Sequence, residues 1–157
     1  MKVTSRDLSL EGLDGLSEVE ALCLFIREDE RPLKGGAGLA DWRMCGKLSE
    51  VLLNGFFQGS PEENLLLPTE GRLAAPRLFA FGIGRTEDLS STRISEGLSH
   101  AARALRKAGI RSVATELPGA GVLSDEERVR LWNGSFTPAF KGDSAVVLAE
   151  KALAKLL

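Results

Sequence analysis

Residues 33–43 read Leu33-Lys34-Gly35-Gly36-Ala37-Gly38-Leu39-Ala40-Asp41-Trp42-Arg43. They follow the apolar run Ala21-Leu22-Cys23-Leu24-Phe25-Ile26, and a helical pattern begins at Leu39. A continuous apolar run of this length is typical of a strand that is covered on both faces. A strand, a glycine-rich connection and a helix form the arrangement in which α/β proteins often bind an anion or a nucleotide. This segment is therefore the first candidate for a binding site.

The rest of the chain alternates between strand and helix patterns. Strands are predicted at residues 2–10, 20–26, 64–68, 77–84 and 110–117, and helices at residues 39–54, 90–108 and 124–136. Residues 144–157 predict a closing helix, although Ala145-Val146-Val147-Leu148 also fits the beginning of a strand. The polar strand at residues 2–10 suits a sheet edge, and Gly12 and Gly15 predict a turn after it. The fold class is therefore α/β: a single three-layer domain over residues 1–157, with a mixed, mostly parallel central sheet flanked by helices.

Two of the predicted helices have clear beginnings. Ser90 is placed to cap the helix at residues 90–108, whose apolar positions recur at intervals of three and four residues. The segment Ser124-Asp125-Glu126-Glu127 is a capping box that opens the helix at residues 124–136.

Composition excludes several functional classes. The 157 residues are 43% hydrophobic and 27% charged, and 20 basic against 22 acidic side chains leave a net charge of −2. This balance does not suggest a dedicated nucleic-acid binder. Cys23 and Cys45 form no CxxC pair, so we expect two buried, reduced thiols. The N-terminus has no apolar signal region, and no apolar run approaches the roughly 18 residues of a membrane span. We therefore expect a cytoplasmic protein without a membrane partner.

Familiar catalytic and metal-binding patterns are missing from the sequence. The one histidine, His100, shares a helix face with Glu96, Arg103 and Lys107, opposite the apolar stripe. It is predicted to be a surface residue, and a general base only where a partner subunit covers it. No zinc-binding cluster, GxSxG or HExxH occurs, and the acidic run at residues 28–30 reads as solvated charge. The sequence thus predicts no catalytic residue, no metal ligand and no cofactor.

Lys34, Gly35, Gly36 and Gly38 are the candidate ligand-binding residues. Glycines let backbone N–H groups approach a phosphate, the following helix adds a favourable dipole, and Lys34 adds a positive charge. The segment matches neither GxGxxG nor GxxxxGK[ST]. A tight strand-to-helix crossover with close packing is the favoured interpretation, and ligand binding remains the alternative.

Three other features are read mainly as packing. Phe81-Gly82-Ile83-Gly84-Arg85 ends a strand and has glycines that would admit a phosphate beside Arg85, but this spacing is common in plain strand ends. Trp42 and Trp132 stand at helical spacing among apolar neighbours, which favours core or interface packing over base stacking.

Taken in order, these segments resemble the N-terminal domain of leucyl aminopeptidases, the cytosol aminopeptidase family. The resemblance covers about residues 18–135 and rests on the strand at 21–26, Arg31-Pro32-Leu33-Lys34-Gly35 with its helix, the strand Asn64-Leu65-Leu66-Leu67-Pro68, the segment from Leu78 to Leu89, the alanine-rich helix and the strand at 112–117. The resemblance implies an accessory α/β module that precedes a separate catalytic domain carrying two metal ions. We expect that catalytic domain to be absent from the 157 residues, and we treat Thr69-Glu70-Gly71-Arg72, which is similar to a motif of it, as a chance likeness.

The accessory domain is in turn similar in fold to macro domains, which bind ADP-ribose through a glycine-rich loop that opens a helix. That loop corresponds here to residues 34–38. Two departures weaken the implied binding. Arg27-Glu28-Asp29-Glu30-Arg31 replaces an Asn-rich segment, and the second glycine run is reduced to Gly119-Ala120-Gly121. Acidic residues beside a pyrophosphate site would also oppose binding.

The leading functional hypothesis is a non-catalytic interaction or regulatory module that acts by self-association, as a homo-oligomer, or by docking on a protein partner. The alternative is nucleotide or ADP-ribose binding at Lys34, Gly35, Gly36 and Gly38. DNA contact, which the resemblance also implies for some relatives, is a weaker alternative because the net charge is close to neutral.

Overall fold

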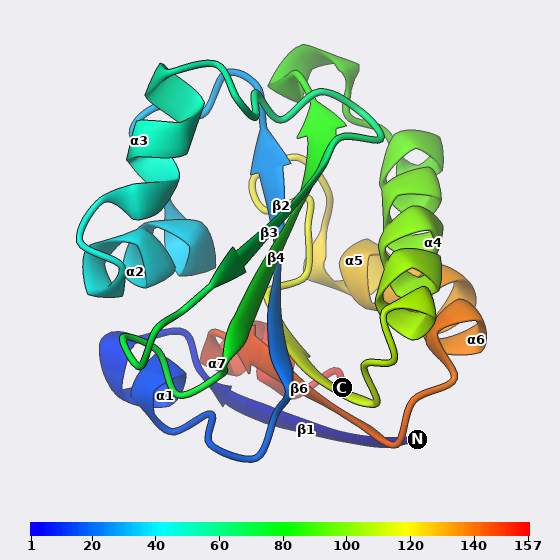
Figure 1. The fold of residues 1–157 in the computed structure, drawn as a ribbon. Helices are drawn as coiled ribbons and strands as arrows, with labels where there is room; N and C mark the ends of the chain where they lie inside the picture. The colour runs from blue at the N-terminus through cyan, green and yellow to red at the C-terminus, as the bar shows by residue number, and fades with distance from the viewer.

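The computed structural model describes residues 1–157 and shows a six-stranded sheet between two layers of helices (Figure 1). The strands are β1 (Lys2–Asp7), β2 (Ala21–Arg27), β3 (Asn64–Pro68), β4 (Arg77–Gly84), β5 (Ser112–Thr115) and β6 (Ser144–Ala149). Their order across the sheet is β1-β6-β5-β2-β4-β3, and every neighbouring pair is parallel except β3 with β4. The predicted mixed, mostly parallel sheet is confirmed.

The helices divide between the two faces of the sheet. They are α1 (Leu10–Asp14), α2 (Gly35–Arg43), α3 (Lys47–Leu53), α4 (Ser91–Lys107), α5 (Asp125–Leu131), α6 (Thr137–Phe140) and α7 (Lys151–Ala154), with a 3-10 turn at Thr86–Asp88 and a π-helical turn at Trp132–Phe136. One hydrophobic core contains residues of α1, α2 and α3, and the other contains residues of α4 to α7. The three-layer α/β class is therefore also confirmed. None of these helices is both long and apolar enough to cross a membrane.

The two helix starts read from the sequence are confirmed at the level of hydrogen bonds. The Ser90 hydroxyl accepts from the Arg93 N–H at 3.1 Å and begins α4, whose apolar stripe is buried. The Ser124 hydroxyl accepts from the Glu127 N–H at 3.2 Å and begins α5. Each bond satisfies one of the N–H groups that a helix start leaves without a partner.

The chain end differs from the predicted closing helix. Residues 144–149 form β6, and only the short α7 follows, so the helix over 144–157 was wrong and the alternative strand start is confirmed. Val146 and Val147 are β-branched, and all of β6 after Ser144 is buried between the two helical layers, which favours a strand. Its neighbour β1 is exposed along its whole length and lies at the sheet edge, as expected.

The helix predicted over residues 39–54 is two helices. It begins earlier, with the glycines themselves, and is interrupted where Cys45 and Gly46 have φ of +55° and +80°. The Asp41 carboxylate stabilises the second start, because it accepts from the N–H groups of Leu48 at 2.8 Å and Ser49 at 3.1 Å. A left-handed pair of residues changes the helix direction without any change in the apolar spacing, so the pattern alone did not reveal the break.

Further expectations fail around these short elements. Gly12 lies inside α1 instead of in a turn, and Ser9 caps that helix. Cys45 is exposed although a buried thiol was expected. Trp42 is 73% exposed, so of the two predicted kinds of packing the structure contradicts core packing and does not test interface packing. Trp132 is buried as expected.

Cys23 is buried as expected, between β4 and β5 in the sheet. Burial raises the pKa of its thiol well above the usual range, so Cys23 is an inert core residue.

Candidate functional site

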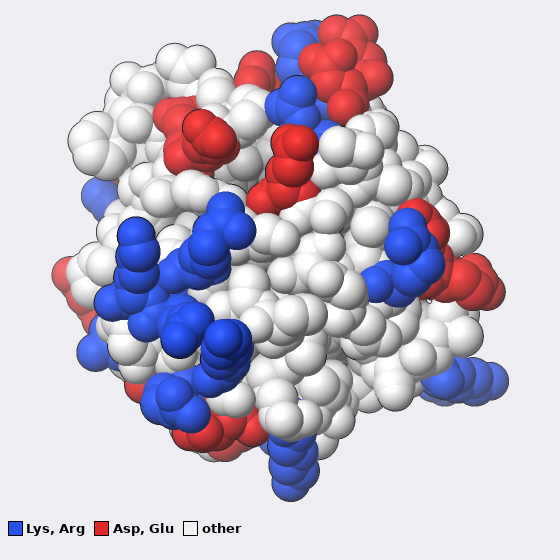
Figure 2. All heavy atoms as spheres, turned by 90° about the vertical axis from the view of Figure 1, so that its right-hand side faces the viewer, with Lys and Arg blue, Asp and Glu red and all other residues white.

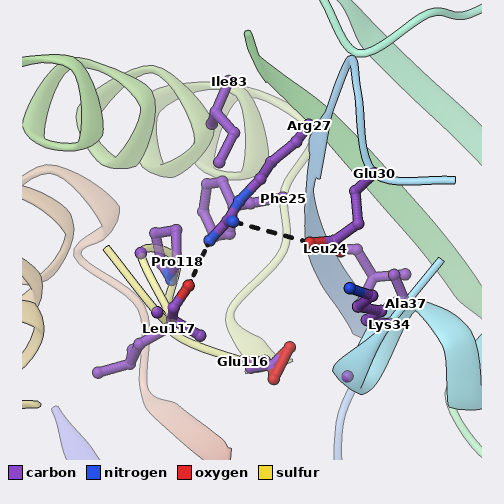
Figure 3. Close-up of a pocket in the computed structure, with 14 residues that line it drawn as sticks. Leu24, Phe25, Arg27, Glu30, Lys34, Ala37, Ile83, Glu116, Leu117 and Pro118 are labelled. Atoms are coloured by element: carbon purple, nitrogen blue, oxygen red, sulfur yellow. Dashed lines mark hydrogen bonds and ion pairs between the residues drawn. The ribbon is translucent and has the colours of Figure 1, made fainter. Parts of the chain in front are cut away.

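A cleft of about 420 Å³ lies at the carboxyl ends of β2 and β5 (Figure 3). In the strand order, β4 lies next to β2 on one side and β5 lies next to it on the other. The chain leads from β2 to β4 and then returns through α4 to β5, so its direction across the sheet reverses at β2. Open α/β sheets bind their ligands at such reversal points, outside the carboxyl ends of the strands. The fold alone thus places a cleft here, and the side chains decide what it accepts.

The beginning of α2 forms one wall, and a carboxylate of this chain already lies against it. Glu116, directly after β5, accepts a hydrogen bond from the Gly36 N–H at 3.0 Å through its Oε1 atom. A Cβ on Gly35 would lie only 2.5 Å from the same oxygen, and Gly35 has a φ of +55°. Glycine is thus required at position 35 both for its backbone conformation and for the approach of Glu116. The position that a bound anion would take at this helix start is occupied by the carboxylate.

Arg27, the last residue of β2, reaches across the cleft (Figure 3). Its Nη2 atom donates to the carbonyl oxygen of Ala120 at 2.7 Å, and its Nη1 atom lies 3.7 Å from the Glu30 carboxylate. Its side chain is only 13% exposed. Arg27 therefore ties together the two loops that flank the cleft, and its charge is already partly balanced.

The opposite wall is the loop after β5, which contains Gly119 and Gly121. Arg128 of α5 holds this loop, because its guanidinium donates to the carbonyl oxygens of Leu117 and Pro118. Its Nη1 atom also donates to Asp125 at 3.0 Å. Gly119 has a φ of +98°, and a Cβ there would approach Ile94 of α4 to 2.9 Å. Hydrogen bonds from Arg128 of α5 and close packing against Ile94 of α4 thus fix the position of this loop.

The charges inside the cleft balance one another. Arg27 and Lys34 stand against Glu30 and Glu116. Burial raises the pKa of Glu116, and this effect outweighs the Gly36 hydrogen bond and the nearby Arg128, which lower it. The cleft therefore offers an anion no net positive charge.

The structure brings together only some of the predicted ligand-binding residues. Lys34 and Gly35 line the cleft, and Gly36 contributes its N–H to Glu116. Gly38 lies deeper in α2 and does not line the cleft; a Cβ there would lie 2.8 Å from the Leu33 carbonyl oxygen. The three glycines form the first turn of α2 instead of a connection before it.

The packing interpretation of the second glycine segment is confirmed. A Cβ on Gly82 would collide with the backbone at Gly59 and Ser60, and Gly84 has a φ of +87°. The charge of Arg85 is engaged by Glu87, whose carboxylate lies 3.1 Å from its Nε atom.

His100 is half-buried rather than fully solvated. Its Nε2 atom lies 2.7 Å from Oδ1 of Asn64 on β3, and its ring stands edge-on to Phe81. It therefore links α4 to the last strand of the sheet.

In the acidic run, Asp29 is exposed as expected, whereas Glu28 and Glu30 are half-buried. Asp29 accepts from the backbone N–H and the hydroxyl of Thr86, each at 3.0 Å, and the backbone bond is the main cause of its lowered pKa. Glu30 pairs with Arg27. No group of three or more His, Cys, Asp or Glu side chains is placed to hold a metal ion.

Sequence reasoning missed Glu116. It stands alone after a short strand, 80 positions from its partner Gly36. Its one signal is its place at the carboxyl end of a parallel strand, and this signal becomes useful only when the strand order is known.

Comparisons with known proteins identify the family and the fold. The family model described as "Cytosol aminopeptidase family, N-terminal domain" matches residues 22–132. A probable cytosol aminopeptidase of Geotalea uraniireducens is 36% identical over 77 residues, which are 49% of this chain and 16% of that protein. One of Geobacter sp. strain M21 is 39% identical over 83 residues, 53% of this chain and 17% of that protein. The chain thus matches only about a sixth of the length of these relatives.

Solved structures show the same fold at low sequence identity. A tomato leucine aminopeptidase mutant has a TM-score of 0.64 at 16% identity, covering 99% of this chain and 34% of that one. The macrodomain of Mycobacterium tuberculosis DarG has a TM-score of 0.68 at 18% identity, covering 94% and 98%. An Oceanobacillus iheyensis macrodomain solved with ADP has a TM-score of 0.70 at 12% identity, covering 88% and 80%.

Proposed function

Since the chain belongs to the cytosol aminopeptidase family, through that family's N-terminal domain, we propose that it is a non-catalytic interaction or regulatory module. It acts by docking on a protein partner or on a second copy of itself. The observation that carries this proposal is that the chain's own side chains take up the binding groups of its cleft. Gly36 donates to Glu116, and Arg27 donates to Ala120.

A ligand phosphate would bind at the beginning of α2 only after the Glu116 carboxylate has been displaced or protonated. Two negative groups at one helix start repel each other, and the partly enclosed cleft strengthens that repulsion. The arginine that would balance a phosphate is already bonded to the opposite loop. The cleft is thus better suited to holding two loops together than to binding an anion.

The outer surface supports docking instead. Leu53, Phe56 and Leu66 are 88%, 76% and 54% exposed. Phe56 and Leu66 line one shallow groove between the end of α3 and β3. Large apolar side chains that gather on a surface in this way are typical of protein interaction sites.

The test uses the purified full chain in two assays. Light scattering together with affinity capture should find the chain in a complex, with itself or with a second protein, and Phe56→Lys should weaken that complex. Hydrolysis of leucine p-nitroanilide should be absent. Peptidase activity that co-purifies with the chain and is lost with a chelator would overturn the proposal, as would a strict monomer that captures no partner.

Nucleotide or ADP-ribose binding remains a second candidate because the cleft lies at the reversal point between two glycine-containing loops, the first including Lys34 and Gly35. The structural neighbours include a macrodomain solved with ADP. If the cleft is a site, ADP-ribose at 100 times its Kd should raise the free energy of unfolding by about 2.7 kcal/mol. Glu116→Gln should bind more tightly than the wild type. The absence of a thermal shift in both proteins at millimolar ADP-ribose would remove this candidate.

A further inference from the structure

The second half of α4 carries basic side chains and no acidic ones. Glu96 is the last acidic residue of this helix, and the charged residues that follow it are Arg103, Arg106 and Lys107. All three side chains are exposed. Arg106 and Lys107 lie in the last turn, where the negative end of the helix dipole favours positive charge. That effect does not extend to Arg103, which lies one turn earlier.

Arg77, the first residue of β4, belongs to the same surface. Its side chain lies on the same face of the sheet as Phe81, because residues four apart in a strand share a face. His100 of α4 packs edge-on against Phe81. From this contact, Arg77 lies about 13 Å back along β4, and Lys107 lies about 10 Å onward along α4, which runs antiparallel to β4. Arg77 and Lys107 therefore lie at the same end of the domain.

These four cations, Arg77, Arg103, Arg106 and Lys107, form what we call the basic face. None of them takes part in an ion pair, whereas eight other basic side chains of the chain do. Figure 2 shows the surface that carries α4, with basic side chains gathered at its lower left and acidic ones above them. The chain as a whole has a net charge of −2, so this positive charge is a local concentration. A partner that brings negative charge here would relieve the repulsion among the cations.

Acidic residues lie at the margins of the basic face. Toward the beginning of α4, a hollow of about 480 Å³ is lined by two acidic and two basic side chains, which balance one another: Glu62, Glu96, Arg93 and Arg103. Glu70 lies in the loop between β3 and β4, and this loop packs toward the other helical layer, because its Leu73 is buried in the core of α1, α2 and α3. The positive charge is therefore strongest around the end of α4.

An exposed apolar side chain borders the basic face. Leu66 of β3 is 54% exposed and lies on the same face of the sheet as Asn64, which His100 of α4 contacts. Lys107 lies two turns after His100 on the same side of α4. Leu66 also lines the groove that contains Phe56. The basic face and the apolar groove thus adjoin at Leu66.

A carboxylate-rich protein segment fits this surface better than a nucleic acid does. A nucleic acid presents a continuous row of phosphates, and the acidic margin at Glu62 and Glu96 would repel those that extend beyond the basic face. A protein segment can place its carboxylates against the guanidinium groups, which bind carboxylates with two parallel hydrogen bonds. The same segment can set an apolar side chain against Leu66, as interfaces with an apolar centre and a polar rim do.

We propose that the basic face docks an acidic segment of a protein partner. The carboxylates of this segment pair with the four cations, and one of its apolar side chains packs on Leu66. The inference rests on the proposed interaction role and names the chemistry of the partner.

Fluorescence anisotropy of a labelled twelve-residue peptide of glutamate and leucine, titrated with the purified full chain at about 50 mM salt, tests this proposal. The wild type should bind the peptide saturably, and the affinity should fall as salt is added. Arg103→Glu combined with Lys107→Glu should weaken binding by about tenfold or more. Lys151→Glu combined with Lys155→Glu is the matched control and should stay within about twofold of the wild type. It makes the same change of charge at two other exposed lysines that form no ion pair.

A second measurement separates the apolar contact from charge alone. Replacing the leucines of the peptide by glutamine should weaken its binding to the wild type several-fold. The same replacement should leave its affinity for Leu66→Gln unchanged, because that variant has already lost the contact.

Three results would overturn the proposal: a wild type that does not bind the peptide, a control that weakens binding as much as the double reversal on α4, or tighter binding of a DNA duplex of equal charge. A captured partner that Phe56→Lys releases and the double reversal on α4 does not would overturn this inference alone and leave the proposed function intact.

Discussion

Glu116→Gln should stabilise the protein at neutral pH. Glu116 is a largely buried carboxyl whose pKa is raised by burial, so its ionised form is less stable in the native state than in the unfolded chain. Glutamine keeps an oxygen that accepts from the Gly36 N–H at the same place. The variant therefore removes the cost of the buried charge and retains the hydrogen bond.

The size of the effect follows from the shift of the Glu116 pKa. Each unit by which the native pKa exceeds the ordinary value corresponds to about 1.4 kcal/mol in the free energy of unfolding well above both values. In a chain of this size, 1 kcal/mol moves the Tm by about 2–4 °C, so each unit corresponds to a rise of about 3–6 °C.

The pH dependence has a definite sign. Because the native pKa of Glu116 is raised, the native state binds more protons than the unfolded state between the two values. The contribution of this group to stability is complete below the unfolded pKa of about 4.3 and is lost as pH rises through the native value. The advantage of Glu116→Gln should be greatest at pH values well above the native pKa and should become small near pH 4, where Glu116 is mostly protonated in both states.

Scanning calorimetry of the two proteins at several pH values measures this difference. Glu96→Gln, which removes an exposed carboxylate from α4, is the control and should stay within about 0.5 kcal/mol of the wild type. A lower Tm for Glu116→Gln at pH 7.5 would show that the ionised carboxylate stabilises α2. A gain that persists undiminished at pH 4 would equally refute the reasoning.

Two further substitutions probe the packing of the domain outside the cleft. Phe136→Ala should cost about 3–5 kcal/mol in urea unfolding, because this buried ring stacks on Trp132 with their centroids 4.1 Å apart, whereas the exposed Phe56→Ala should change little. Gly82→Ala should lower the Tm strongly, because a Cβ there meets the neighbouring backbone, while Gly134→Ala, which faces open space, should leave it unchanged or raise it slightly. Equal effects within either pair would contradict the packing that the structure describes.

The strand and helix order could be predicted because most of its signals are local. Serine caps, an apolar stripe at helical spacing and buried apolar runs each act over a few residues, and α4, α5 and β2 follow from them. The predictions failed where a few backbone angles decide the outcome. The left-handed Cys45 and Gly46 divide one apolar pattern between α2 and α3. The end of the chain forms a strand because it pairs with β1. This partner lies more than 130 positions away along the sequence, so a local pattern does not reveal it.

The side chains that line the cleft come from segments that are far apart in the sequence, and they bear most on function. The strand order places the cleft between β2 and β5, and the same order occurs with very different side chains in proteins of one fold. In this chain Arg27 and Glu116, brought together from strands that are distant in sequence, bind to the loops of the cleft themselves. A glycine-rich helix start would attract an anion if it were free. Here the Glu116 carboxylate lies at that helix start and accepts from the Gly36 N–H.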